Sequence, residues 1–213
     1  QYPVDMSMLL DHPKRETKQD LTFLFPHRLD PLYDPNTALK WFYEINKLFP
    51  HTKLIMNGFG ILRKDLFKQI GLLGLQDKVS FADSIKSWGD LHKVYRSGDV
   101  MLSSKHGLDK SLENPWGISD WSIAEMDACA SGMGLIVSKC SLGLNQMMKK
   151  TNSGFIIEDP SDIHAVIDAS KRYINEHDLL MLHGSKLRAA VKKYSAPEFA
   201  KNLLRISQKF SRF

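Results

Sequence analysis

Apolar residues along this chain fall into short runs that alternate with longer stretches of helical spacing. Short runs predict buried strands at residues 21–26, 53–56, 79–81, 100–103, 135–138 and 154–157. Apolar positions three and four residues apart predict helices at 36–49, 62–73, 88–96, 119–131, 144–149 and 161–175, and two more near 178–192 and 197–211. Between these elements, residues 104–118 form a long polar stretch, which is typical of a functional loop.

The strands and helices thus alternate about six times, and the strands are continuously apolar rather than alternating. This pattern favours a parallel sheet with both faces covered. The predicted fold class is α/β, a Rossmann-like doubly wound parallel sheet of about six strands with helices on both faces. Because such sheets bind ligands beyond the carboxyl ends of their strands, the segments that directly follow the strands are the candidate site.

Composition narrows the functional classes. The 213 residues are 43% hydrophobic and 25% charged, which excludes collagen-like, disordered and disulfide-scaffold proteins. No apolar run approaches the ~20 residues that a membrane span needs. The 29 Lys and Arg against 24 Asp and Glu leave a net charge of +5, which suits phosphate, anionic lipid or nucleic acid without choosing among them. The two cysteines lack Cys-x-x-Cys spacing and the eight histidines are scattered, so we expect no metal site.

Five segments follow the predicted strands, at residues 26–30, 57–60, 103–106, 119–132 and 138–144. Most contain a glycine, a basic residue or a helix start, which are the groups that bind a diphosphate. None is a Walker loop, and Gly58-Phe59-Gly60 lacks the third glycine of the dinucleotide fingerprint. Each segment alone is weak evidence.

Taken in order, these segments resemble the C-terminal, donor-binding domain of the GT-B retaining glycosyltransferases of group 1, which include sucrose synthases and bacterial mannosyltransferases. Residues 25–34 are similar to the family's Gly-Arg-Leu-x-x-x-Lys-Gly, and residues 54–60 to its strand ending in Gly-x-Gly. Residues 127–136 resemble Glu-Ala-Met-Ala-Cys-Gly-x-Pro-Val-Ile, and residues 154–162 resemble Gly-Phe-Leu-Val-x-Pro-x-Asp. The likeness covers about residues 20–200.

The resemblance implies a site for a nucleotide-diphosphate sugar, with Asp127 on the ribose hydroxyls and Arg28 stabilising the departing diphosphate. The donor-binding residues that it implies are His27, Arg28, Gly58, Gly60, Lys105, Ser119 and Asp127. The family's acid eight positions before Asp127 falls on Ser119. Asp120 beside it and Glu113 in a displaced loop therefore compete for the role of sugar-binding catalytic acid, and the sequence leaves this choice open.

One departure from the family changes the expected chemistry. The family's phosphate-binding lysine falls on Tyr33, which carries no positive charge, so Lys105, Lys110 or Lys139 is needed to help Arg28. Plainer interpretations also stand: Arg28 in a surface salt bridge, Asp127 as a solvated acid near a helix start, Gly58 and Gly60 as a simple turn. Lys105 and the following histidine can likewise be ordinary exposed loop residues.

For the organisation of the chain, we expect a linker at 1–20, a donor-binding domain at 21–176 and C-terminal helices at 177–213 packing on it. The acceptor domain of such an enzyme would precede this chain. The expected function is hexosyl transfer with retention, without a metal or other cofactor, to an acceptor that is a glycan, a lipid-linked molecule or a nucleic acid. The expected location is the cytoplasm, free or peripheral to a membrane, and the fragment alone can be inactive.

Three alternatives remain open at this stage. One is a GT-B epimerase that acts on the nucleotide sugar without an acceptor. A second is a degenerate, non-catalytic binding module, which the missing lysine at Tyr33 favours. The Pro26-His27-Arg28 opening also resembles a branch that glycosylates a modified base of transfer RNA, although the residues around Asp127 do not follow that branch.

Overall fold

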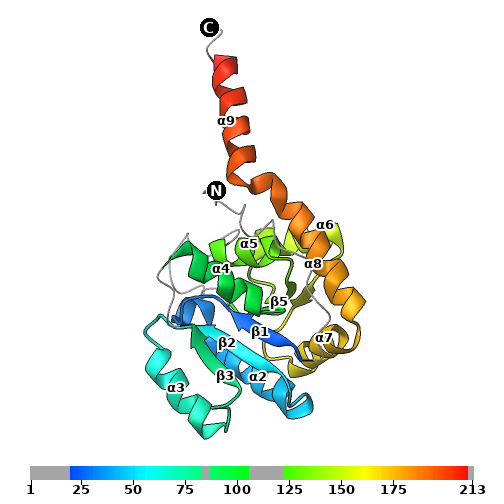
Figure 1. Ribbon diagram of the computed structural model, residues 1–213. Helices are drawn as coiled ribbons and strands as arrows, with labels where there is room; N and C mark the ends of the chain where they lie inside the picture. Colours follow the sequence, from blue (N-terminus) through cyan, green and yellow to red (C-terminus); the bar gives the residue numbers. More distant parts are fainter. Residues whose placement is uncertain (1–19, 83–86, 106–121, 211–213) are drawn as a thin grey trace.

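The structure is a computed structural model that describes residues 20–82, 87–105 and 122–210 (Figure 1). Its strands are β1 (Thr22–Phe25), β2 (Lys53–Asn57), β3 (Val79–Ala82), β4 (Val100–Ser103), β5 (Gly134–Ser138) and β6 (Phe155–Ile157). The helices are α2 (Pro35–Leu48), α3 (Arg63–Leu72), α4 (Trp88–Ser97), α5 (Ile123–Ala130), α6 (Leu142–Thr151), α7 (Ile163–Asn175), α8 (His177–Val191) and α9 (Ala196–Phe210), with short 3-10 turns η1 (Pro31–Tyr33) and η2 (Lys192–Tyr194).

The described strands form one parallel sheet in the order β3-β2-β1-β4-β5-β6. This confirms the predicted doubly wound α/β fold. In this strand order the chain winds outward from β1 in one direction and from β4 in the other. The boundary between β1 and β4 is therefore the topological switch point, where the carboxyl ends of the strands leave a crevice for ligands.

Two apolar layers cover the sheet, and the side chains of β1 show how they are separated. Phe23 and Phe25 lie in one layer with buried residues of α2, α3 and α7. Leu24, which points to the opposite face, lies in the other layer with residues of α5, α6 and α8. Both faces of the central strands β1, β4 and β5 are thus buried, which explains why these strands appear in the sequence as continuous apolar runs instead of alternation.

Helix α5 begins later than the sequence pattern predicts. Ser122 caps it by accepting a hydrogen bond from the Glu125 backbone N–H, and the Glu125 side chain accepts one from the Ser122 N–H. This capping box satisfies donors of the first turn that have no partner within the helix. Residues 119–121, which the pattern includes in the helix, lie outside the described residues.

The last two helices behave differently from each other. Helix α8 packs against α5, α6 and β5, and buries Leu180, Leu187 and Val191. Helix α9 extends away from the α/β body and follows η2 (Figure 1). Its Leu203 and Leu204 side chains are exposed. Within the described part of the chain, no helix combines the length and apolar character needed to cross a membrane.

Candidate functional site

A buried polar cluster lies at the switch point, beyond the carboxyl ends of β1 and β4. Its centre is the fully buried carboxylate of Glu125, on the first turn of α5. Atom Oε1 accepts hydrogen bonds from Ser141 Oγ at 2.5 Å and Ser103 Oγ at 3.3 Å. The ammonium of Lys105 lies 3.1 Å from the same oxygen, and His27 Nε2 lies 4.0 Å away. Segments that follow β1, β4 and β5 thus meet on one carboxylate.

The environment of Glu125 keeps this carboxylate ionised. Burial alone raises the pKa of a carboxyl group, but the positive charge of Lys105 and the hydrogen bonds from Ser122 and Ser141 outweigh it, so the pKa of Glu125 is lowered. A buried carboxylate without such partners would cost several kcal/mol, on the order of the effective desolvation penalty of a single ion. The cluster therefore holds a fixed negative charge beside a buried cation.

Lys105 is held in place through its backbone and through its neighbour. The Lys105 carbonyl accepts a hydrogen bond from Ser138 Oγ at the end of β5. The adjacent Ser104 donates through Oγ to the carbonyls of Tyr33 and Asp34. The ammonium also lies 5.8 Å from the centre of the Tyr33 ring, within cation–π range. Lys105 is buried, so the interpretation of this lysine as an exposed loop residue is wrong.

His27 follows β1 and belongs to the same cluster. Its ring stacks on Tyr33 with 4.8 Å between the ring centres, and its Nε2 lies 3.0 Å from Ser103 Oγ. Because Ser103 donates its proton to Glu125, we assign Nε2–H as the donor to Ser103. Burial lowers the pKa of His27 to about 3, so the ring is neutral at physiological pH.

Arg28, the predicted partner of the diphosphate, lies outside this buried cluster. Its side chain is 64% exposed, and Nε donates to Asp30 Oδ2 at 2.7 Å. Arg28 is thus in the surface salt bridge that the sequence left as an alternative, and its guanidinium is open to solvent. The hydrogen bond to Asp30 raises the pKa of Arg28, which stays cationic.

The turn after β2 supports the segment that carries Arg28. The Leu29 N–H donates to the Phe59 carbonyl at 2.7 Å, and the Ile61 N–H donates to Asp30 Oδ1 at 3.0 Å. Gly60 has φ +145°, and a Cβ there would lie 2.4 Å from the Leu29 backbone. Gly60 is therefore required by close backbone approach, whereas Gly58 is buried without a positive φ.

Asp127 lies on α5, two residues after Glu125, and is 2% exposed. Its Oδ1 is buried and has no hydrogen-bond partner among the described residues. Burial raises the pKa of this carboxyl to about 7. The alternative in which Asp127 is a solvated helix acid is therefore wrong. An unsatisfied buried carboxyl oxygen is a ready acceptor for a ligand hydroxyl.

Several candidates from the sequence cannot be placed. Glu113, Ser119, Asp120 and Lys110 lie outside the described residues. Lys139 is described and exposed, after β5. Of the two described lysines considered as replacements for a cation at Tyr33, Lys105 is the one that lies against that residue.

Glu125 and its partners Ser103 and Ser141 fall in segments that follow predicted strands, but no sequence pattern singled them out as site residues. The spacing Ser122-x-x-Glu125 before an apolar helix is a capping-box signature and could have located the helix start. It does not reveal that Oε1 faces the ends of three strands. Ser141 is also concealed, because it stands at the N-cap of α6 while its hydroxyl donates to Glu125 instead of capping the helix.

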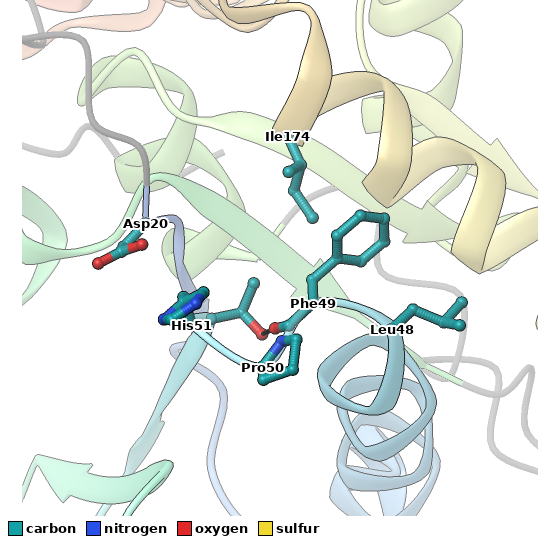
Figure 2. A pocket seen from close by; sticks show the side chains of 7 residues that line it. Asp20, Leu48, Phe49, Pro50, His51 and Ile174 are labelled. Carbon is teal, nitrogen blue, oxygen red and sulfur yellow. Dashed lines mark hydrogen bonds between the residues drawn. The ribbon is translucent and has the colours of Figure 1, made fainter.

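A hollow of about 450 Å³ lies at the opposite edge of the sheet (Figure 2). Its lining comes from residues that precede β1 and β2 and from the ends of α2 and α7, namely Asp20, Leu48, Phe49, Pro50, His51, Thr52 and Ile174. It lies at the amino ends of the strands and shares no residue with the Glu125 cluster. Among the described residues, no group of three His, Cys, Asp or Glu side chains is arranged to hold a metal ion.

Comparison with solved structures identifies similar folds. Sucrose-phosphate synthase from Thermosynechococcus elongatus superposes with a TM-score of 0.70 at 19% identity, over 99% of this chain and 50% of that one. Anabaena HepE in complex with UDP gives 0.71 at 14% identity, over 99% of this chain and 56% of that one. The chain therefore spans about half the length of these proteins.

A third structure matches almost end to end. The C-terminal domain of LpcC, a group 1 family glycosyltransferase from Francisella tularensis, gives a TM-score of 0.69 at 15% identity, over 91% of this chain and 99% of that one. No curated protein sequence matches the chain. The family model for glycosyl transferases group 1 matches residues 10–196. With that match extending over most of its length and with this fold, the chain belongs to the group 1 glycosyltransferase family.

Proposed function

We propose that this chain supplies the nucleotide-sugar donor site of a retaining glycosyltransferase that needs no metal ion. The observation that carries the proposal is the buried Lys105 at the switch point, with the unsatisfied carboxyl of Asp127 two residues along α5 from its partner Glu125. A buried cation at this edge matches the phosphates of a nucleoside diphosphate, and the unsatisfied carboxyl oxygen of Asp127 farther along α5 is an acceptor for a ribose hydroxyl.

The proposed chemistry is stabilisation of the leaving group. When the bond between sugar and diphosphate breaks, negative charge builds on the diphosphate. Lys105 from within and the exposed Arg28 from the rim would stabilise that charge, and stabilisation in a buried, preorganised site acts more strongly than in water. Asp127 Oδ1 would accept a hydrogen bond from a ribose hydroxyl. The sugar-binding acid, Asp120 or Glu113, would orient the sugar.

The comparisons support this proposal without extending to the donor or the acceptor. The HepE structure is a complex with UDP, and so is a structure of TarM from S. aureus, which superposes on this chain with a TM-score of 0.72 at 16% identity, over 92% of this chain and 37% of that one. We propose that this chain binds a nucleoside diphosphate at the carboxyl ends of β1 and β4.

Calorimetric titration of the 213-residue chain with UDP-, GDP- and ADP-sugars tests the proposal. We expect micromolar affinity for sugars of one base. Asp127→Ala should weaken that binding by about tenfold, since it removes the acceptor of one hydrogen bond from the ribose. Asp168→Ala, at an exposed position of α7, is the matched control and should bind normally. Failure of all three nucleotide sugars to bind would instead favour a non-catalytic module.

A further inference from the structure

Lys105 depends on Glu125 for its place in the structure. A buried ammonium is destabilised by desolvation unless an anion or hydrogen bonds compensate it. Glu125 lies 3.1 Å away, and no N–H of the ammonium makes a well-directed hydrogen bond to any described residue. The ammonium is thus fixed mainly by charge attraction to Glu125, and its N–H groups retain capacity for an anionic ligand.

The two oxygens of Glu125 have separate tasks. Oε2 accepts from the Ser122 N–H and completes the helix cap. Oε1 takes no part in the cap and accepts from Ser141 and Ser103 beside Lys105. A helix cap would need only the first of these oxygens. The second therefore serves the segments at the ends of the strands.

We infer that Glu125 is a positioning residue of the donor site, which holds the Lys105 ammonium beside Tyr33 at the carboxyl ends of β1 and β4, ready for the diphosphate. This inference rests on the proposed function. Glu125 does not itself touch the donor in this proposal, because a carboxylate would repel a diphosphate. It acts through Lys105, and its effect should disappear when Lys105 is removed.

Glu125→Gln separates this role from that of a helix cap. The amide oxygen can still accept from the Ser122 N–H, while the –NH₂ group then takes the place of Oε1 and faces the ammonium with its positive end. Simple Coulomb reasoning predicts the opposite effect, since removing a negative charge near the site should strengthen anion binding. The sign of the change therefore decides between positioning and mere repulsion.

The measured quantity is the phosphate preference, defined as the affinity for a nucleoside diphosphate divided by the affinity for the same nucleoside. Calorimetry on the 213-residue chain uses UDP with uridine, or the pair for whichever base binds. The variants are Glu125→Gln, Lys105→Met and their combination. Glu44→Gln is the control, because Glu44 pairs with Lys47 on α2 in an exposed i,i+3 ion pair. Thermal unfolding checks that each variant is folded.

We expect Glu125→Gln and Lys105→Met each to lower the phosphate preference by about tenfold or more, a size typical for loss of a charge-assisted contact. Glu125→Gln should have no further effect in the Lys105→Met background, as expected for residues that act as one unit. Lys105→Arg should retain the preference. If Glu125→Gln does not fold, Glu125→Asp, which shortens the side chain by one methylene, replaces it, and a lower preference is again expected.

Two results would overturn the inference alone. One is a phosphate preference in Glu125→Gln that is unchanged or higher than in the wild-type chain. The other is a double variant whose loss of phosphate preference equals the sum of the losses in the two single variants on a free-energy scale. A wild-type chain that binds a nucleoside diphosphate no better than the nucleoside would overturn the proposed function together with the inference. The wild-type titration thus separates the two failures.

Discussion

At the scale of single residues, the site holds two ionisable groups whose pKa values are shifted toward the neutral form by burial. The carboxyl of Asp127 has its pKa raised from 3.8 to about 7, and the imidazole of His27 has its pKa lowered from 6.5 to about 3. Their effects on stability have opposite signs. Between pH 4 and 7 the folded chain holds a proton on Asp127 that the unfolded chain has lost, so this group makes stability fall as pH rises. Between pH 3 and 6.5 the unfolded chain protonates His27 and the folded chain does not, so stability rises with pH.

Replacing Asp127 should expose the contribution of His27. In the wild-type chain the two slopes oppose each other between about pH 4 and 6.5. Asp127→Asn removes the decrease of stability with pH that is due to Asp127, so the free energy of unfolding should rise more steeply with pH over that interval. At pH 8 the variant should be more stable by about 1–3 kcal/mol, because an unpaired buried carboxylate has been replaced by a neutral group. Chemical denaturation from pH 4 to 8 measures both, and a variant with the wild-type slope would contradict this assignment.

The residues of the site differ in how far the sequence could predict them. Asp127 and Lys105 could be proposed because each stands after a strand or in a motif with a known order. Glu125 could not, because its importance depends on Ser103 and Ser141, which are separated from it by 22 and 16 residues and approach it only in the folded sheet. Arg28 could be proposed from its motif, but its ion pair with Asp30, two residues along the chain, lies at the surface.

At the scale of elements, the sequence pattern located each described strand to within a residue or two, because strands buried on both faces appear as continuous apolar runs. It was less accurate at α5, where the start depends on a cap rather than on periodicity. The sequence pattern also did not predict the contact between the turn after β2 and the segment after β1. That contact depends on Gly60, which the Gly-x-Gly motif includes, but the motif does not show that the Leu29 backbone packs against this glycine.

Gly60→Ala tests the contact between Gly60 and the Leu29 backbone. A Cβ at residue 60 would lie 2.4 Å from the backbone of Leu29, so the two segments must separate. We expect a loss of about 1–3 kcal/mol in stability, as for other strained backbone positions, together with weaker nucleotide binding. Urea denaturation and calorimetry measure the two effects.

Gly71→Ala is the matched control for this substitution. Gly71 lies within α3, and the nearest atom to a Cβ there is 3.9 Å away. It should gain about 0.5–1 kcal/mol, because alanine has the higher helix propensity. Equal effects of the two substitutions would show that the contact between Gly60 and Leu29 has no energetic weight.

At the scale of the whole molecule, stability should come from the sheet and its two layers of helices. The described side chains of α9 from residue 200 to 208 are exposed, so they bury little apolar surface in this chain. Deletion of residues 200–213 should therefore change Tm by less than about 2 °C, which corresponds to less than about 1 kcal/mol for a domain of this size.

Differential scanning calorimetry of the shortened chain checks this expectation. A deletion that also removes α8, from residue 177 onward, is the comparison. It takes away the buried Leu180, Leu187 and Val191 and should prevent stable folding. A large drop in Tm after the shorter deletion would mean that α9 contributes to the core.

The adjacency of β1 and β4 has a consequence for folding. His27 and Ser103 are 76 residues apart in sequence and touch only because the chain reverses its winding between these two strands. Contacts of such long range form slowly, after the local units around them. An intermediate containing only the first three strands and their helices would lack Ser103, Lys105 and Glu125 altogether. During refolding, recovery of nucleoside diphosphate binding should therefore lag behind the return of helical circular dichroism, which makes the ligand a probe for the docking of the two halves of the sheet.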